Sequence, residues 1–425
     1  MIHLSLASQE SIIRSLAKTA TTIEQLRLFK ATVFSLSLSI SRGTITPVEG
    51  QKTYISKKTS ITRTCEAFAD AIDGTIRELE SWCAGREEAM CRAYAGIDEE
   101  PVIVSLLHTE KALRDNYASS FDVLLDIVRT VFRVAPEDNI DSFGYILERN
   151  RQSPAAQTAL LLDTLFAAVQ QHMERKDSVV CDILMKVFVR TAEPVWGMMG
   201  RWLKDGMGLG LGLRNTSRGT SSWGEQDDEF FIERSGLGFG MMGLGLLDHE
   251  FWSEGYALRE ISISSDDPVL VKGKASSPIK KVIPLFLQHI ADLVLGTGKA
   301  VGLMRALDTH ASFNAFEKWG KFSELIISEF GFATSTSETR DNRLLSVSVD
   351  GLSRSVYDNL SLKCQAVGEK LVQVLVGDCA LWKHLEAIED LYLMRKGDAM
   401  SHFVDIVFAK VFTLPPLCSP CRVEC

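Results

Sequence analysis

The chain has 425 residues, with 46 Lys and Arg against 55 Asp and Glu, a formal net charge of −9 and 46% hydrophobic residues. This composition is that of a globular protein with a sizeable core, and about 150 residues per domain predicts two or three structural units. The acidic balance argues against nucleic-acid binding, which needs a basic surface, and the abundant apolar residues argue against disorder.

Nine cysteines are present, an odd number, and the first six are scattered along the chain. A secreted disulfide framework is denser and usually even, so we expect reduced thiols in a cytosolic protein. Residues 1–8 lack the basic and apolar regions of a signal peptide. The most apolar stretch, 282–295, is interrupted by Gln288, His289 and Asp292. We therefore expect no membrane span.

Apolar residues recur at helical spacing through most of the chain, which predicts helices. The predicted helical segments are 11–39, 65–94, 102–134, a segment beginning at 154, 181–204, 284–307, 313–330, 357–376, 380–394 and 400–412. Residues 205–245 are rich in glycine and predict a long connection. Within it only 229–232 is strand-like, and it is too short to build a sheet. The predicted fold is all-α, with elongated stacked helical bundles and a long glycine-rich insertion.

Two glycine motifs are similar to nucleotide-binding loops, and neither predicts one. Residues 238–243 fit GxGxxG, but no alternating strand and helix pattern surrounds them. Residues 296–299 read Gly-Thr-Gly-Lys inside a helical pattern, and Ala300 stands where a phosphate loop needs a hydroxyl for Mg²⁺. We expect no nucleotide and no other cofactor.

Other patterns for chemistry are also weak. The acidic residues of 225–229 lack the alternating spacing of a calcium loop and indicate a solvated charge run. The chain has neither HExxH nor GxSxG. Residues 418–425 hold one CxxC pair and a third cysteine, which is half a zinc site at best, and a frayed or unrelated tail is favoured. We expect no metal site and no enzymatic activity.

Four blocks carry a specific resemblance. They are 192–206 (AEPVWGMMGRWLKDG), 228–232 (DEFFI), 251–259 (FWSEGYALR) and 282–305, which begins VIPLFL and includes GTGK and LMR. Their order and spacing resemble those of the gamma-tubulin complex component family, and 67–82, 105–133 and 384–405 are similar to flanking helices of that family. The resemblance covers about 11–412, and the glycine-rich insertion favours the component five or six branch.

This resemblance implies a division of the chain into regions. An N-terminal GRIP region would occupy 1–330, with its insertion at about 205–250, and a linker would occupy 331–356. The incomplete start of a C-terminal GRIP region would occupy 357–412, followed by a non-family tail at 413–425. In the family, the N-terminal region contacts neighbouring components laterally and the C-terminal region holds gamma-tubulin. Because most of the latter region is missing, we expect weak or absent gamma-tubulin binding.

The implied function is that of a structural component of the gamma-tubulin ring complex. Such a component organises gamma-tubulin for microtubule nucleation at microtubule-organising centres, the centrosome or spindle pole body, in the cytoplasm. The alternative is a helical adaptor or tether, or a truncated capping subunit without nucleating activity.

The family-motif and interface candidates are aromatic, charged and glycine positions of the resembling blocks. They are Trp196, Trp202, Phe230, Phe231, Trp252, Tyr256, Arg259, Pro284, Gly298, Lys299, His384, Tyr392 and Asp398. We expect the aromatic rings at 196, 202, 252 and 256 to anchor the core, with interface hot spots as the alternative. Gly298 would allow close helix approach, Lys299 would be a solvated or capping charge, and Arg259 is a candidate to pair with Glu193.

Overall fold

The computed structural model describes residues 5–41, 61–95, 105–133, 153–207, 228–234, 252, 254–262, 279–307, 316, 318–330, 349–393 and 395–413. Its helices are α1 (Leu6–Ser41), α2 (Arg63–Tyr94), α3 (Leu106–Leu113), α4 (Ser119–Phe132), α6 (Pro154–Glu174), α7 (Ser178–Asp205), α9 (Ala291–Ala306), α10 (Phe322–Phe330), α12 (Val349–Gln373), α13 (Leu381–Tyr392) and α14 (Gly397–Thr413). The all-α prediction is confirmed. Most of the glycine-rich insertion, the GxGxxG motif and the cysteine tail lie outside the described residues.

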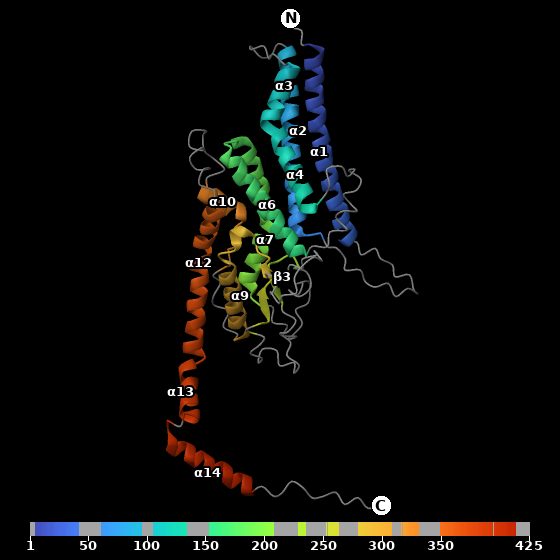
Figure 1. The fold of residues 1–425 in the computed structure, drawn as a ribbon. Coiled ribbons are helices and arrows are strands. Elements are labelled where there is room, and N and C mark those ends of the chain that lie inside the picture. Colours follow the sequence, from blue (N-terminus) through green and yellow to red (C-terminus); the bar gives the residue numbers. More distant parts are fainter. Residues whose placement is uncertain are drawn as a thin grey trace, which may run out of the picture.

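The helices stack into an elongated body (Figure 1). α1 to α4 lie together near the N-terminus, and α2 packs along α7, which also contacts α6, α9 and α10. α7 buries side chains along its whole length, from Val180 to Leu203. One hydrophobic cluster runs without a break from Leu26 of α1 to Val367 of α12. The body is therefore held by a continuous core with α7 at its centre.

Local sequence signals set several helix ends. The hydroxyl of Thr62 accepts a hydrogen bond from the Cys65 backbone N–H at 3.1 Å and so caps α2. Ser153 caps α6 in the same way, and Pro154 stands in the first turn, where its missing N–H costs nothing. α4 ends at Arg133, whose φ of 53° is left-handed. These signals place the helix boundaries close to those that periodicity predicts.

Two small antiparallel ribbons interrupt the helices, and they correct the sequence prediction. β1 (Ile232–Arg234) pairs with β2 (Tyr256–Leu258), and β3 (Glu260–Ser262) pairs with β4 (Ile279–Lys281). The predicted strand-like segment 229–232 overlaps β1 only at Ile232, because residues 229–231 form a turn and bend. The expectation that this segment builds no sheet was wrong, because the partner strand β2 lies beyond most of the insertion. The helix predicted from 284 begins only at Ala291, after a 3₁₀ turn at Leu285–Leu287.

α12 begins at Val349, inside the predicted linker at 331–356. Its buried apolar side chains lie on one stripe, because they recur every three or four residues and face α9 and the 3₁₀ turn. This stripe consists of Leu352, Val356, Leu360, Cys364 and Val367. α12 thus shares the core of α7 and α9, while the division of the chain into regions at 330 and 357 stays a prediction.

α13 and α14 extend away from the body (Figure 1). A π-helical turn at Val374–Asp378 and a left-handed Ala380 separate α12 from α13. No residue of α13 is buried. We call residues 381–413 the C-terminal arm. Among the described helices, none is long and apolar enough to cross a bilayer.

Candidate interaction surface

The tightest helix contact joins α7 to α9 through Trp202 and Gly298. Trp202 is only 1% exposed, and its indole Nε1 donates to the Val294 carbonyl oxygen at 2.9 Å. A Cβ placed at Gly298 would lie 2.1 Å from that nitrogen, so a larger residue has no space there. Tyr256 of β2 covers the indole, with ring centroids 5.2 Å apart. The expected close approach at Gly298 is therefore present, and Trp202 anchors the core.

Trp196 anchors a second aromatic group one and a half turns earlier on α7. Its indole N–H donates to the Gly320 carbonyl oxygen at 2.9 Å, and its ring lies 4.7 Å from Trp319 and 5.3 Å from Phe322. Gly200 of α7 makes room for Trp319, because a Cβ there would lie 2.6 Å from that indole. Trp196 therefore joins α7 to the segment that leads into α10, and it belongs to the core.

Glu229 is buried, which corrects the prediction of a solvated charge run. Its carboxylate accepts hydrogen bonds from the backbone N–H groups of Arg63 at 2.9 Å and Thr64 at 2.8 Å, and from the Thr158 hydroxyl at 3.0 Å. Burial raises the pKa of Glu229 above its ordinary value, although these hydrogen bonds act in the opposite direction. The carboxylate thus caps the start of α2 and ties it to α6. The adjacent Phe230 and Phe231 are also buried.

The candidate pair of Arg259 and Glu193 does not form. Arg259 Nε lies 3.5 Å from the Glu233 carboxylate, across the β1 and β2 ribbon. Glu193 instead accepts the backbone N–H of Phe322 at 3.0 Å, at the start of α10. The predicted pairing was wrong, because Arg259 contacts Glu233 of strand β1 and Glu193 accepts from the first residue of α10.

The remaining motif residues of the body are buried or partly buried. Pro284 is buried just before the 3₁₀ turn, and Trp252 is partly buried against the core. Lys299 is half-buried, and this burial lowers the pKa of its ammonium group. The Gly-Thr-Gly-Lys motif lies within α9, where Trp202 fills the space over Gly298. That space cannot hold a phosphate group.

No group of three or more His, Cys, Asp or Glu side chains suited to a metal ion occurs in the part of the chain that the structure describes. His384, Tyr392 and Asp398 behave differently from the motif residues of the body, since all three are exposed on the arm. The sequence blocks therefore divide into a buried junction and an exposed arm.

The arm carries a large exposed apolar surface. Its members, which we call the arm stripe, are Leu381, Trp382, Leu385, Ile388, Leu391, Tyr392, Leu393, Phe403, Ile406, Val407 and Phe408. Trp382 is 65% exposed and Tyr392 80%. Ion pairs of Arg395 with Glu389 at 3.1 Å and of Lys396 with Asp390 at 2.5 Å hold the turn between α13 and α14. Exposed apolar surface of this extent marks a contact site, so the arm stripe is the candidate interaction surface.

Comparison with known families gives the assignment. A family model described as gamma tubulin complex component N-terminal matches residues 1–378. The chain belongs to the gamma-tubulin complex component family. The match covers the whole helical body through the π-helical turn, and the arm lies beyond it. No curated protein matches the chain. The component five or six branch stays a prediction.

Sequence reasoning missed the roles of three residues in this helical body, namely Glu229, Trp319 and Gly320. Glu229 carries no local signal of burial, because it follows other acidic residues in the chain. Trp319 and Gly320 stand just before α10 and complete the Trp196 cluster, and the tryptophan in the otherwise exposed Lys-Trp-Gly-Lys segment was a usable signal that this segment packs against the core. The roles of all the candidates in binding stay predictions, whereas their burial or exposure is now defined.

Proposed function

We propose that this chain is a structural, non-enzymatic subunit of a gamma-tubulin complex. It lies beside other components of the complex and helps to organise gamma-tubulin for microtubule nucleation at cytoplasmic microtubule-organising centres such as the centrosome or spindle pole body. The observation that carries this proposal is the family match over 1–378, which coincides with the continuous helical body.

The proposed mechanism is geometric. A subunit that sets the spacing of its partners must be rigid between its contact points. The core supplies this rigidity, since α7 is locked to α9 by Trp202 and to the start of α10 by Trp196. Close-packed interiors transmit displacement with little compression. The motif aromatics therefore support function by stiffening the body, and the arm stripe supplies a surface for a partner.

Co-expression with other gamma-tubulin complex components, followed by size-exclusion chromatography, tests the proposal. We expect the chain to elute with at least one component in a stable complex. Separate elution from every component would contradict the proposal. Co-elution with complexes that then fail to nucleate microtubules would support the alternative of an adaptor, tether or capping subunit.

A matched pair of variants sharpens this test. Gly298→Ala forces a methyl group against Trp202, whereas Gly296→Ala adds the same group to α9 where nothing lies within 4 Å. If the rigid junction supports assembly, Gly298→Ala reduces co-elution and Gly296→Ala leaves it unchanged.

A further inference from the structure

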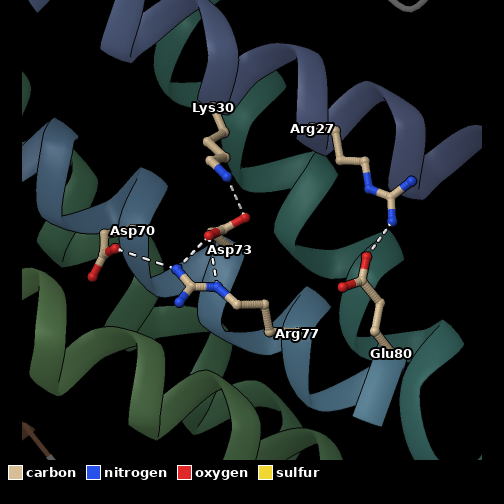
Figure 2. Close-up of polar contacts among 6 residues, drawn as sticks. All are labelled: Arg27, Lys30, Asp70, Asp73, Arg77 and Glu80. Carbon is tan, nitrogen blue, oxygen red and sulfur yellow. Dashed lines mark hydrogen bonds and ion pairs between the residues drawn. The ribbon is translucent and has the colours of Figure 1, made fainter. Parts of the chain in front are cut away.

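The polar contacts between α1 and the bundle formed by α2, α3 and α4 have a consistent direction. α1 supplies mainly hydrogen-bond donors and cations, and the bundle supplies carboxylates. On the α2 side, Lys30 Nζ lies 2.5 Å from Asp73, and Arg27 lies 2.5 Å from Glu80 (Figure 2). Arg77 of α2 also contacts Asp73, so this carboxylate is shared by two cations (Figure 2). Attraction between α1 and the bundle is therefore partly electrostatic.

The same arrangement continues toward the N-terminus on α3 and α4. The Ser15 hydroxyl donates to the Glu110 carboxylate at 2.8 Å, and Lys18 Nζ lies 3.0 Å from Asp122. The Thr22 hydroxyl lies 3.1 Å from the other oxygen of Asp122. The exception to this polarity is farther along, where Arg129 donates to Gln25 at 3.0 Å.

The two halves of α1 differ in how they meet the core. Leu26, Phe29 and Val33 belong to the continuous hydrophobic cluster, and the Phe29 ring lies 5.9 Å from Phe68 of α2. None of the described residues 6–22 belongs to that cluster, and Ile12 is the apolar side chain that this half buries. The first half is therefore held mainly by polar contacts, and the second half is anchored by apolar packing.

Glu110 of α3 is the buried carboxylate that the first half of α1 contacts, so its environment depends on the residue at position 15. It is only 5% exposed, and its partners are Ser15 and, at 3.4 Å, Arg114. A buried carboxylate that loses a hydrogen-bond donor and gains an anionic neighbour is strongly destabilised. Negative charge placed at Ser15 would do both at once.

We propose that residues 6–22 of α1 form a clasp that opens separately from the rest of the fold, and that negative charge at Ser15 opens it. Opening uncovers the faces of α3 and α4 that this half of α1 covers, while Phe29 keeps the second half in place. The clasp is a conformational device, and it does not depend on the proposed function. The charge would be supplied by transfer of the γ-phosphoryl group of ATP to the Ser15 hydroxyl oxygen by a protein kinase, with loss of the hydroxyl proton and release of ADP.

Hydrogen–deuterium exchange of the full chain, read peptide by peptide, tests the clasp. In Ser15→Glu we expect residues 6–22 to exchange at least about tenfold faster, the factor that corresponds to one lost hydrogen bond to a charged group. Residues 26–37 and α7 should keep the wild-type rate. Ser11→Glu is the matched control, because it adds the same charge at an exposed position one turn earlier on α1.

A second substitution separates charge from steric effects. Glu110→Gln removes the negative charge that faces position 15, so the double variant Ser15→Glu with Glu110→Gln should recover most of the protection. Equal acceleration in Ser11→Glu and Ser15→Glu would overturn the proposal. Acceleration that reaches α7 to the same degree would also overturn it, since the clasp would then not open separately.

The wild-type chain gives an independent test if the Ser15 variant does not fold. Raising the salt concentration from about 0.05 M to about 0.5 M shortens the screening length and weakens exposed pairs such as Lys18 with Asp122. We expect faster exchange in residues 6–22 with no change in α7. An unchanged rate in both segments would overturn the proposal.

Discussion

Gly298 lies under the indole of Trp202, and that indole donates to the carbonyl of Val294 one turn earlier on the same helix. The missing side chain at 298 and the hydrogen bond at 294 are two parts of one contact. The indole of Trp202 can reach the Val294 oxygen only because Gly298, which lies against the indole on α9, has no Cβ. The position of α9 on α7 depends on this arrangement.

We predict that Gly298→Ala lowers the free energy of unfolding by about 3 kcal/mol, because overpacking a fully buried ring displaces it and strains its hydrogen bond. Urea denaturation followed by circular dichroism measures the change. Gly296→Ala is the control on the same helix, and it should stabilise the protein by up to about 1 kcal/mol, since alanine favours a helix interior. Equal stability of the two variants would contradict the close packing.

The contrast between Gly298 and Glu229 shows which features the sequence could predict. Helical periodicity and capping residues act locally, so α2 and α6 lie near their predicted positions, and the motif around Gly298 indicated a close helix approach. The burial of Glu229 depends instead on the N-terminus of α2, which is 165 residues away in the chain. The pairing of β1 with β2 is non-local for the same reason, and no spacing rule reveals either one.

Removal of the Glu229 carboxylate should destabilise the start of α2. Glu229→Ala leaves the backbone N–H groups of Arg63 and Thr64 without their acceptor, and we expect a loss of about 2 to 4 kcal/mol for two or three buried hydrogen bonds. Asp228→Ala changes an exposed neighbour and should stay within about 0.5 kcal/mol of the wild type. Thermal and urea unfolding measure both; a small effect at 229 would mean that water replaces the carboxylate.

The dependence of the free energy of unfolding on pH should reflect the raised pKa of Glu229. Burial raises the pKa of Glu229 above 4.5, so the folded state binds this proton more tightly than the unfolded chain does. Its contribution to stability is then greatest below the ordinary pKa and is lost as pH rises through the folded pKa. Glutamine does not titrate. The stability of the wild type minus that of Glu229→Gln should therefore fall as pH rises above the ordinary glutamate pKa of 4.5; a difference that rises would reverse the sign of the shift.

Thiol reactivity should separate the cysteines by burial. Burial raises the pKa of Cys181 to about 11, and the thiol is buried against Val169 of α6, so little reactive thiolate is present or accessible at neutral pH. Cys91 is exposed near the end of α2. Alkylation of the native protein, with peptide mass spectrometry, should modify Cys91 well before Cys181. Denaturation should remove the difference; comparable native rates would contradict the burial of Cys181.

Substitution in the arm stripe should affect association without affecting folding. Ile388 is 50% exposed and α13 buries no residue, so Ile388→Glu removes little packing and the unfolding transition of the body should not change. If a partner covers the arm stripe, a charge at its centre must be desolvated on binding, and we expect affinity to fall about tenfold or more. Lys383→Glu is the control, since it changes an exposed charge outside the stripe on the same helix. Co-elution and titration against gamma-tubulin complex components measure the effect. Equal binding by both variants would place the contact elsewhere, because an apolar interface cannot accept a buried glutamate at no cost.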